Sequence, residues 1–131
     1  SVTLREEMEF ASAYIFLLKM RFENNLQFDI QVDKAYEDFR LPPMAVQVLV
    51  ENAVKHNEIS NRKPLTIHIT TDGNGYLSVS NDIQPKWTAT PGTGIGLVNL
   101  AKRYHLLFKQ EIQITEDKEF TVSIPLIDKA Q

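Results

Sequence analysis

Three polar side chains gather on one predicted helix, within the stretch LVENAVKHN (residues 49–57). Asn52, Lys55 and His56 are three and four residues apart, so they share one flank of the helix beside its apolar stripe. An Asn amide oxygen can coordinate a hard cation such as Mg²⁺, and a Lys ammonium can contact phosphate oxygens. The alternative interpretation is a polar helix end, where Lys and His complement the helix dipole. A second motif is needed to decide between the two.

That second motif is the glycine cluster GTGIGL (residues 92–97), which holds three of the five glycines of the chain. Gly92, Gly94 and Gly96 let the backbone approach a ligand closely, and the amides at the start of the following helix can bind phosphate. The cluster does not follow a strand directly, and it lacks the Gly-Lys-Ser/Thr of a Walker loop. The two motifs together favour a site that holds the phosphates of a Mg-nucleotide between a glycine loop and a helix.

The periodicity of apolar residues predicts the elements that position these motifs. Helices are expected over 3–24, 44–56 and 95–108, and strands over 26–33, 64–72, 76–82, 111–115 and 120–126. The segment QPKWTATPGTG (84–94) is predicted to be a loop. Two consecutive hairpins exclude a purely alternating parallel fold. The order predicts a two-layer α/β sandwich, in which a mixed sheet carries its helices on one face.

Apolar residues at helical spacing predict which helix faces are buried. Thr3 and Glu6 fit a capping box at the first helix, and Pro42 and Pro43 fit the start of the second. The heptad-like spacing of the first helix also suits pairing with another helix. The residues expected to be buried are Leu4, Met8, Ala11, Ile15, Leu18 and Phe22; Val46, Leu49, Val50 and Ala53; and Leu97, Val98, Ala101, Tyr104, His105 and Phe108.

Composition excludes several classes of function. The 131 residues suffice for one hydrophobic core, and 14 basic against 17 acidic residues give a net charge of -3. This charge argues against binding to a nucleic-acid backbone. The absence of cysteine excludes disulfides and thiolate metal sites. No apolar run is long enough to span a membrane, so we expect no membrane contact by these residues.

The two motifs resemble the nucleotide-binding boxes of the GHKL superfamily. LVENAVKHN is similar to the N box, and GTGIGLVNLAKRY (92–104) is similar to the G2 box. More closely, the chain resembles the cytoplasmic end of LytS-type sensor histidine kinases, with LSVSNDIQPK (77–86) in the G1 region and FTVSIPL (120–126) as the closing strand. The resemblance implies that residues 1–24 are a helix from the end of the phosphoacceptor region. Residues 25–131 would then form the ATP-binding catalytic domain.

The resemblance also implies roles for individual residues. Asn52 would bind Mg²⁺, and Glu51 matches the general base of the water-activating ATPases in the superfamily. The residues implied to face the nucleotide are Asn52, Lys55, His56, Asn57, Asn81, Asp82, Gly92, Thr93, Gly94, Ile95, Gly96 and Leu97.

One position departs from the superfamily pattern. Where the G1 box has an Asp that accepts a hydrogen bond from the adenine amino group, this chain has Asn81, which is a neutral and weaker acceptor. Asp82 would take that task if the register shifts by one residue.

The resemblance finally implies an activity and its partners. The chain would bind Mg-ATP and pass the γ-phosphoryl group to a histidine outside this chain, on the phosphoacceptor helical domain of its own parent protein. That domain would then serve a response regulator, and the parent would be a homodimer, anchored in the membrane with these residues in the cytoplasm.

Two alternatives to this function stay open at this point. One is a nucleotide-binding or structural module without turnover, and the other is an ATPase of the chaperone or topoisomerase branch that uses Glu51.

Overall fold

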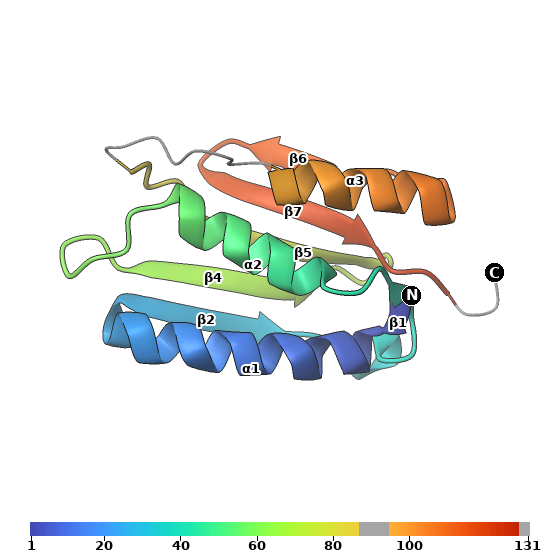
Figure 1. The fold of residues 1–131 in the computed structure, drawn as a ribbon, viewed down its shortest axis with the longest axis horizontal. Coiled ribbons are helices and arrows are strands. Elements are labelled where there is room, and N and C mark those ends of the chain that lie inside the picture. Colours follow the sequence, from blue (N-terminus) through green and yellow to red (C-terminus); the bar gives the residue numbers. More distant parts are fainter. Residues whose placement is uncertain (87–94, 129–131) are drawn as a thin grey trace.

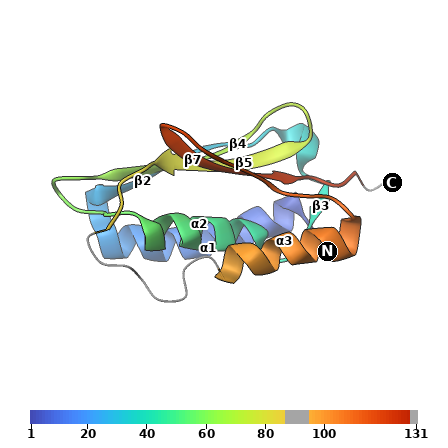
Figure 2. The same cartoon turned by 90° about the horizontal axis from the view of Figure 1, so that it is seen from above.

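The computed structural model describes residues 1–86 and 95–128 (Figure 1), and these residues form two layers (Figure 2). A five-stranded sheet forms one layer, and α1 (Leu4–Phe22), α2 (Ala45–His56) and α3 (Ile95–Phe108) lie together on one face of it (Figure 2). Two short 3₁₀ turns, η1 (Glu23–Asn25) and η2 (Lys34–Tyr36), flank the first strand of this sheet. The predicted two-layer sandwich with helices on one face is confirmed.

The sheet is mixed, as predicted. Its strand order is β2 (Leu26–Gln31), β4 (Leu65–Thr71), β5 (Tyr76–Asp82), β7 (Glu119–Pro125) and β6 (Gln113–Glu116). β2 and β4 are parallel and are connected through α2, whereas the other neighbours are antiparallel. A separate two-stranded pair joins β1 (Val2–Thr3) to β3 (Arg40–Leu41).

The turn between β4 and β5 has the glycines that its geometry requires. Gly73 and Gly75 have φ values of 80° and 89°, which side chains on L residues disfavour. The side chain of Asp72 accepts hydrogen bonds from the backbone N–H groups of Asn74 and Tyr76, at 2.7 and 3.2 Å. This turn fixes the register of the hairpin, and thereby the position of the last residues of β5.

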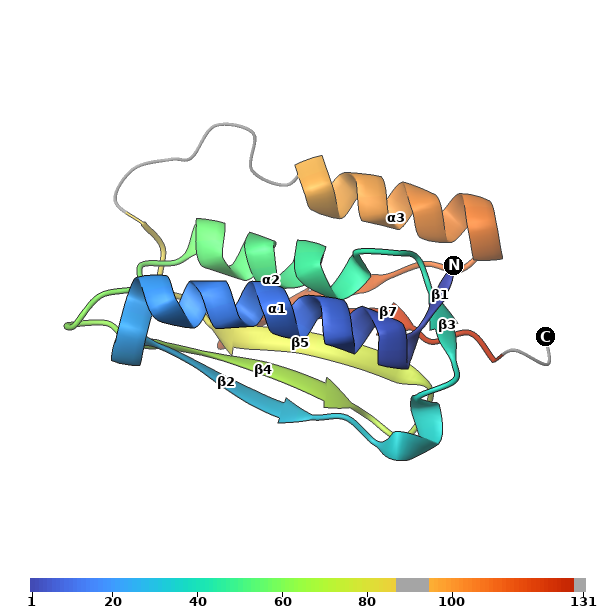
Figure 3. The same ribbon diagram turned by 60° about the horizontal axis from the view of Figure 1, so that its bottom comes forward.

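The predicted buried stripes of α1 and α2 lie against the sheet. Thr3 and Glu6 form the expected capping box at the start of α1. The first helix packs into the same core as the rest of the chain, next to α2 (Figure 3). Assignment of residues 1–24 to the end of a phosphoacceptor region stays a prediction about the parent protein. No helix in the described part of the chain has the length and apolar character needed to cross a membrane.

The predicted buried face of α3 was wrong in part. Val98 is 52% exposed and His105 is also exposed, whereas Leu100, which the prediction omitted, is fully buried with Tyr104. The buried stripe therefore follows Leu97, Leu100 and Tyr104, because α3 packs against α2 and the end of β7 rather than squarely on the sheet. The prediction mixed two adjacent stripes that are both apolar.

Glu7 is a buried acidic residue that the sequence analysis missed. Its side chain is 3% exposed, and its two carboxylate oxygens accept hydrogen bonds from the backbone N–H groups of Met44 and Val46, each at 2.9 Å. Met44 precedes α2 with a left-handed φ of 70° and no capping bond from its own side chain. Glu7 of α1 thus caps the helix that carries the N-box motif. Burial raises the pKa of Glu7, and the hydrogen bonds from the α2 backbone oppose that shift.

We expect Tyr104→Phe to lower the free energy of unfolding by about 1–2 kcal/mol. The buried Tyr104 hydroxyl donates to the carbonyl oxygen of Pro125 at 2.9 Å, which ties α3 to the end of β7. Urea denaturation followed by circular dichroism measures the change. Tyr36→Phe serves as the control, because it retains the ring contact with Phe39. Equal stability of the two variants would contradict this role of the Tyr104 hydroxyl.

Candidate nucleotide site

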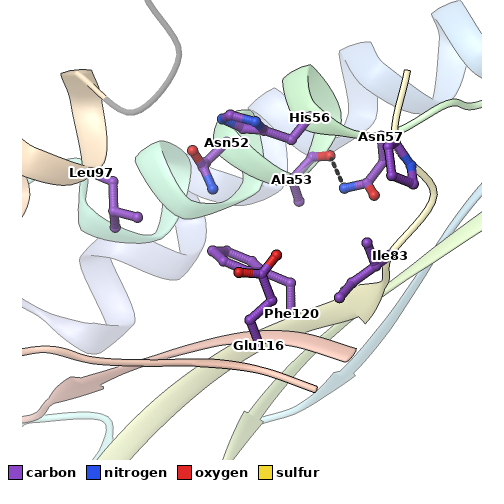
Figure 4. A pocket seen from close by; sticks show the side chains of 9 residues that line it. Asn52, Ala53, His56, Asn57, Ile83, Leu97, Glu116 and Phe120 are labelled. Atoms are coloured by element: carbon purple, nitrogen blue, oxygen red, sulfur yellow. Dashed lines mark hydrogen bonds between the residues drawn. The ribbon is translucent and has the colours of Figure 1, made fainter. Parts of the chain in front are cut away.

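A pocket lies between α2 and the sheet, near the carboxyl end of β5 (Figure 4). In this view Leu97 of α3 lies at one end, Ile83 lies at the other, and Glu116 and Phe120 lie between them below α2. The lining is largely apolar with a few polar groups, which is the usual character of a small-molecule site. The described residues that line it are Asn52, Ala53, His56, Asn57, Ile83, Pro85, Leu97, Glu116 and Phe120.

The buried face of α2 orients the polar side chains of this helix. Leu49 and Val50 are fully or almost fully buried in the core, so the flank that carries Asn52 and His56 lies at the pocket. These two residues are one turn apart, and Asn52 extends from α2 on the side that faces Phe120 (Figure 4). The structure therefore brings together two of the three polar residues that the sequence singled out on this helix.

Lys55 and Glu51 are placed differently. The Lys55 ammonium and a Glu51 carboxylate oxygen form an ion pair at 2.8 Å, and both side chains are about half exposed. The hydrogen bond and charge of Glu51 raise the pKa of Lys55. The pKa of Tyr14, a residue of α1, is raised first by burial and then by the charge of Glu51. The Glu51–Lys55 ion pair therefore lies on the side of α2 that faces α1. Neither residue is among the described residues that line the pocket, and their predicted roles stay predictions.

Asn57 has a structural part in the site. It is 5% exposed, its amide nitrogen donates to the carbonyl oxygen of Ala53 at 2.8 Å, and its amide oxygen accepts from the N–H of Gln84 at 2.8 Å. A backbone bridge to Pro85 lies beside these bonds. Asn57 therefore joins the end of α2 to the segment after β5, and it holds Ile83 and Pro85 at the pocket.

Asn81 is buried next to the pocket, on the helix-covered face of β5. It is 1% exposed, and its amide nitrogen donates to the carbonyl oxygen of Asp82 at 2.7 Å. Because this bond fixes the amide, the Asn81 oxygen is left as the acceptor. Asn81 pairs directly with Phe120 of β7, which lines the pocket. Asp82 follows on the opposite face of the sheet and is exposed.

The glycine motif is described only from its second half. Gly92, Thr93 and Gly94 lie outside the described residues, as does Trp87 of the predicted loop. Ile95, Gly96 and Leu97 form the first turn of α3, and Leu97 lines the pocket. A Cβ added at Gly96 would lie 3.4 Å from a methyl group of Val48, so this glycine sits where α3 packs closely against α2.

Sequence reasoning missed the sheet side of the pocket. Glu116, Phe120, Ile83 and Pro85 line it, yet none belongs to the N box or the glycine cluster. Glu116 and Phe120 belong to two strands and become neighbours only through the pairing of β6 with β7. No local pattern signals such a contact.

Comparison with known proteins gives matches in both sequence and structure. No family model matches the chain. The Sensor protein LytS of Streptococcus agalactiae is 35% identical over 122 residues, and that of Staphylococcus epidermidis is 32% identical over 124 residues. Each match covers 82% of this chain and 21% of the relative.

Among solved structures, the catalytic domain of histidine kinase ThkA superposes with a TM-score of 0.60 at 23% identity, over 96% of this chain and 97% of that one. Acinetobacter baumannii histidine kinase AdeS gives a TM-score of 0.57 at 12% identity, over 97% of this chain and 66% of that one.

The fold is therefore that of a histidine kinase catalytic domain. By sequence, the chain is related to the LytS-type sensor proteins, and it spans about a fifth of the length of the relatives it matches.

Proposed function

We propose that this chain is the ATP-binding catalytic domain of a two-component sensor histidine kinase. It binds Mg-ATP between α2 and the sheet, and the γ-phosphoryl group passes to a histidine outside this chain. One observation carries the proposal: Asn52 and His56 of the N-box motif and Leu97 of the glycine motif, 40 or more residues apart in sequence, line the same pocket. Phosphoryl transfer depends mainly on positioning and charge neutralisation, which this arrangement can supply.

The donor set fits Mg²⁺ that is held jointly by protein and substrate. Within the described residues, no group of three or more His, Cys, Asp or Glu side chains could hold a metal ion. Mg²⁺ commonly takes one or two protein ligands and completes its shell with water and phosphate oxygens. The amide oxygen of Asn52 would be such a ligand. Bound Mg²⁺ supplies positive charge that offsets the charge on the phosphate oxygens.

The other residues of the chain orient the substrate. The first N–H groups of α3 have no partner within the helix, so Ile95, Gly96 and Leu97 offer donors and the positive end of the helix dipole to the phosphates. We assign Gly92, Thr93 and Gly94 to the same phosphate end on the basis of the family resemblance. His56 faces the ligand from α2, and Asn57 holds the apolar end of the pocket in place.

The placement of Glu51 favours a kinase over a hydrolase. A hydrolase of this superfamily would use Glu51 to activate water, but its carboxylate is engaged by Lys55 and lies away from the pocket. Transfer to histidine needs no such base, since the imidazole is itself the nucleophile. Lys55 would have to leave Glu51 to reach a phosphate, which a half-exposed pair permits at low cost.

The partners follow from the same proposal. The relatives are named sensor proteins, and we infer a parent that carries its own phosphoacceptor helical domain and serves a response regulator through it. A homodimeric, membrane-anchored parent with this domain in the cytoplasm completes the proposal.

Radiolabelled phosphoryl transfer tests the proposed activity. The parent protein, incubated with Mg²⁺ and ATP labelled at the γ-phosphate, should acquire label that is stable in base and lost in acid, as expected for phosphohistidine. Asn52→Ala should abolish the labelling, whereas Glu119→Gln, on the open face of the sheet, should retain it. Acid-stable label, or no label on the wild type, would contradict the proposal.

Asn81→Asp is expected to change both stability and base preference. The new carboxylate oxygen would lie against the Asp82 carbonyl oxygen and lose the bond at 2.7 Å, which should cost about 1–3 kcal/mol of unfolding free energy. It should also widen the preference for ATP over GTP, because guanine has a carbonyl where adenine has its amino group. Denaturation and nucleotide titration measure the two effects, with the exposed Asp82→Asn as the control. If the ratio of the affinities for ATP and GTP were the same in Asn81→Asp and the wild type, Asn81 would not recognise the base.

A further inference from the structure

We propose that Glu116 of β6 recognises the ribose of the bound nucleotide by accepting hydrogen bonds from its hydroxyl groups. This inference rests on the proposed function and assigns a specificity residue that lies outside the N-box and glycine motifs. It is carried by the position of Glu116 in the sheet, by its charge and by its place between the two ends of the pocket.

The pairing of three strands aims Glu116 at the pocket. Glu116 pairs directly with Phe120 of β7, and Phe120 pairs directly with Asn81 of β5. Paired residues project from the same face of a sheet, so the three side chains form one row beneath the helices. Glu116 stands at the outer end of this row and, with Phe120, it lines the pocket (Figure 4).

The charge of Glu116 restricts what it can contact. It is the one acidic side chain among the described residues that line the pocket. An ionised carboxylate has no hydrogen-bond donor, so it can act only as an acceptor. Its negative charge also repels the phosphates of a nucleotide. Its favourable contacts on the nucleotide itself are therefore the neutral donors, which are the amino group of the base and the ribose hydroxyls. Mg²⁺ also attracts a carboxylate, but the proposed function assigns it to Asn52 and the phosphates.

The geometry of the pocket selects the ribose. The α3 end, with Leu97 and the helix N-terminus, suits the phosphates, and Asn52 lies near it (Figure 4). The opposite end, with Ile83 and Pro85, is apolar and suits the flat base. Glu116 is drawn between the two ends in Figure 4, and the sugar of a nucleotide joins its base to its phosphates, so we assign the contact of Glu116 to the sugar. The two oxygens of a carboxylate match the two neighbouring hydroxyls of a ribose, as in dinucleotide sites.

A comparison of ATP with 2′-deoxy-ATP tests this assignment. Titration calorimetry in Mg²⁺ should show that the wild type binds ATP about tenfold or more tightly than 2′-deoxy-ATP, because the deoxy sugar lacks one hydroxyl that donates a hydrogen bond to the charged carboxylate. Glu116→Ala should reduce this ratio to near one. Glu116→Gln, which keeps the shape and one acceptor oxygen, should give an intermediate ratio. Glu119→Ala on the same hairpin should keep the wild-type ratio, because its strand position faces the open side of the sheet.

Each other outcome overturns the inference. A wild type that does not distinguish the two nucleotides, or a Glu116→Ala variant that keeps the full ratio, would show that Glu116 does not contact the sugar. If Glu116→Ala bound both ATP and 2′-deoxy-ATP more tightly than the wild type, and by the same factor, Glu116 would act only by repelling the charged phosphates. If Glu116→Ala lost the preference for ATP over GTP but kept the wild-type ratio of affinities for ATP and 2′-deoxy-ATP, Glu116 would contact the base and not the sugar. Absence of any nucleotide binding by a folded wild type would instead refute the proposed function itself.

Discussion

Replacement of Glu7 by alanine is expected to lower the free energy of unfolding by about 2–5 kcal/mol. Glu7 is 3% exposed and satisfies two backbone N–H groups at the start of α2, each at 2.9 Å. Its removal leaves the buried N–H of Val46 and the part-buried N–H of Met44 without this acceptor, and it leaves a void between α1 and α2. Because Met44 offers no side-chain cap, no local group replaces the lost acceptor. Urea denaturation followed by circular dichroism gives the change directly.

Two further variants sharpen the Glu7 test. Glu7→Gln keeps the volume but turns one acceptor oxygen into a donor that faces a backbone N–H, so its cost should fall between zero and that of alanine. Glu9→Ala removes an exposed carboxylate from the same helix and should change stability by less than about 0.5 kcal/mol. If Glu7→Ala were no more destabilising than Glu9→Ala, the capping role of Glu7 would be wrong.

Asn52→Ala is expected to weaken Mg-dependent nucleotide binding by on the order of 100-fold, or about 2.7 kcal/mol. Asn52 lines the pocket from the flank of α2. Its side-chain amide oxygen is the one best placed to share a cation with the phosphates. Its side chain is partly exposed and lies outside the buried core, so the fold should be retained. Calorimetric titration with ATP, with and without Mg²⁺, measures the loss.

The dependence on Mg²⁺ separates this role from simple packing. In EDTA the wild type and Asn52→Ala should bind ATP equally weakly, because the amide oxygen then has no cation to coordinate. Asn61→Ala removes the same side chain from an exposed position outside the pocket and should behave like the wild type. An Asn52→Ala variant with wild-type affinity for Mg-ATP would refute the assignment of Asn52 as a ligand.

Local patterns predicted the elements of this fold well. The periodicity of residues 95–108 gave the bounds of α3, and alternation with a glycine turn gave the β4–β5 hairpin. These signals are local, since a helix or hairpin is encoded by residues a few positions apart. The buried face of α3 was less predictable, because two adjacent stripes of that helix are apolar and only its packing against α2 selects one.

Contacts between distant segments could not be predicted from one sequence. Glu7 is separated by 37 residues from Met44, and Asn57 by 27 from Gln84, yet these bonds fix the start of α2 and the apolar end of the pocket. The row from Glu116 to Asn81 exists only once β5, β7 and β6 are paired. Lys55 was grouped with Asn52 by spacing, but the same spacing rule also allows its observed partner Glu51.

Titration of the chain with Mg-ATP is the measurement that tests the central claim most directly. The pocket that joins the N-box and glycine motifs predicts saturable binding at one site, with a dissociation constant below about 1 mM, which is weakened by EDTA and by Asn52→Ala. A folded chain that takes up no nucleotide at about 1 mM Mg-ATP would contradict it.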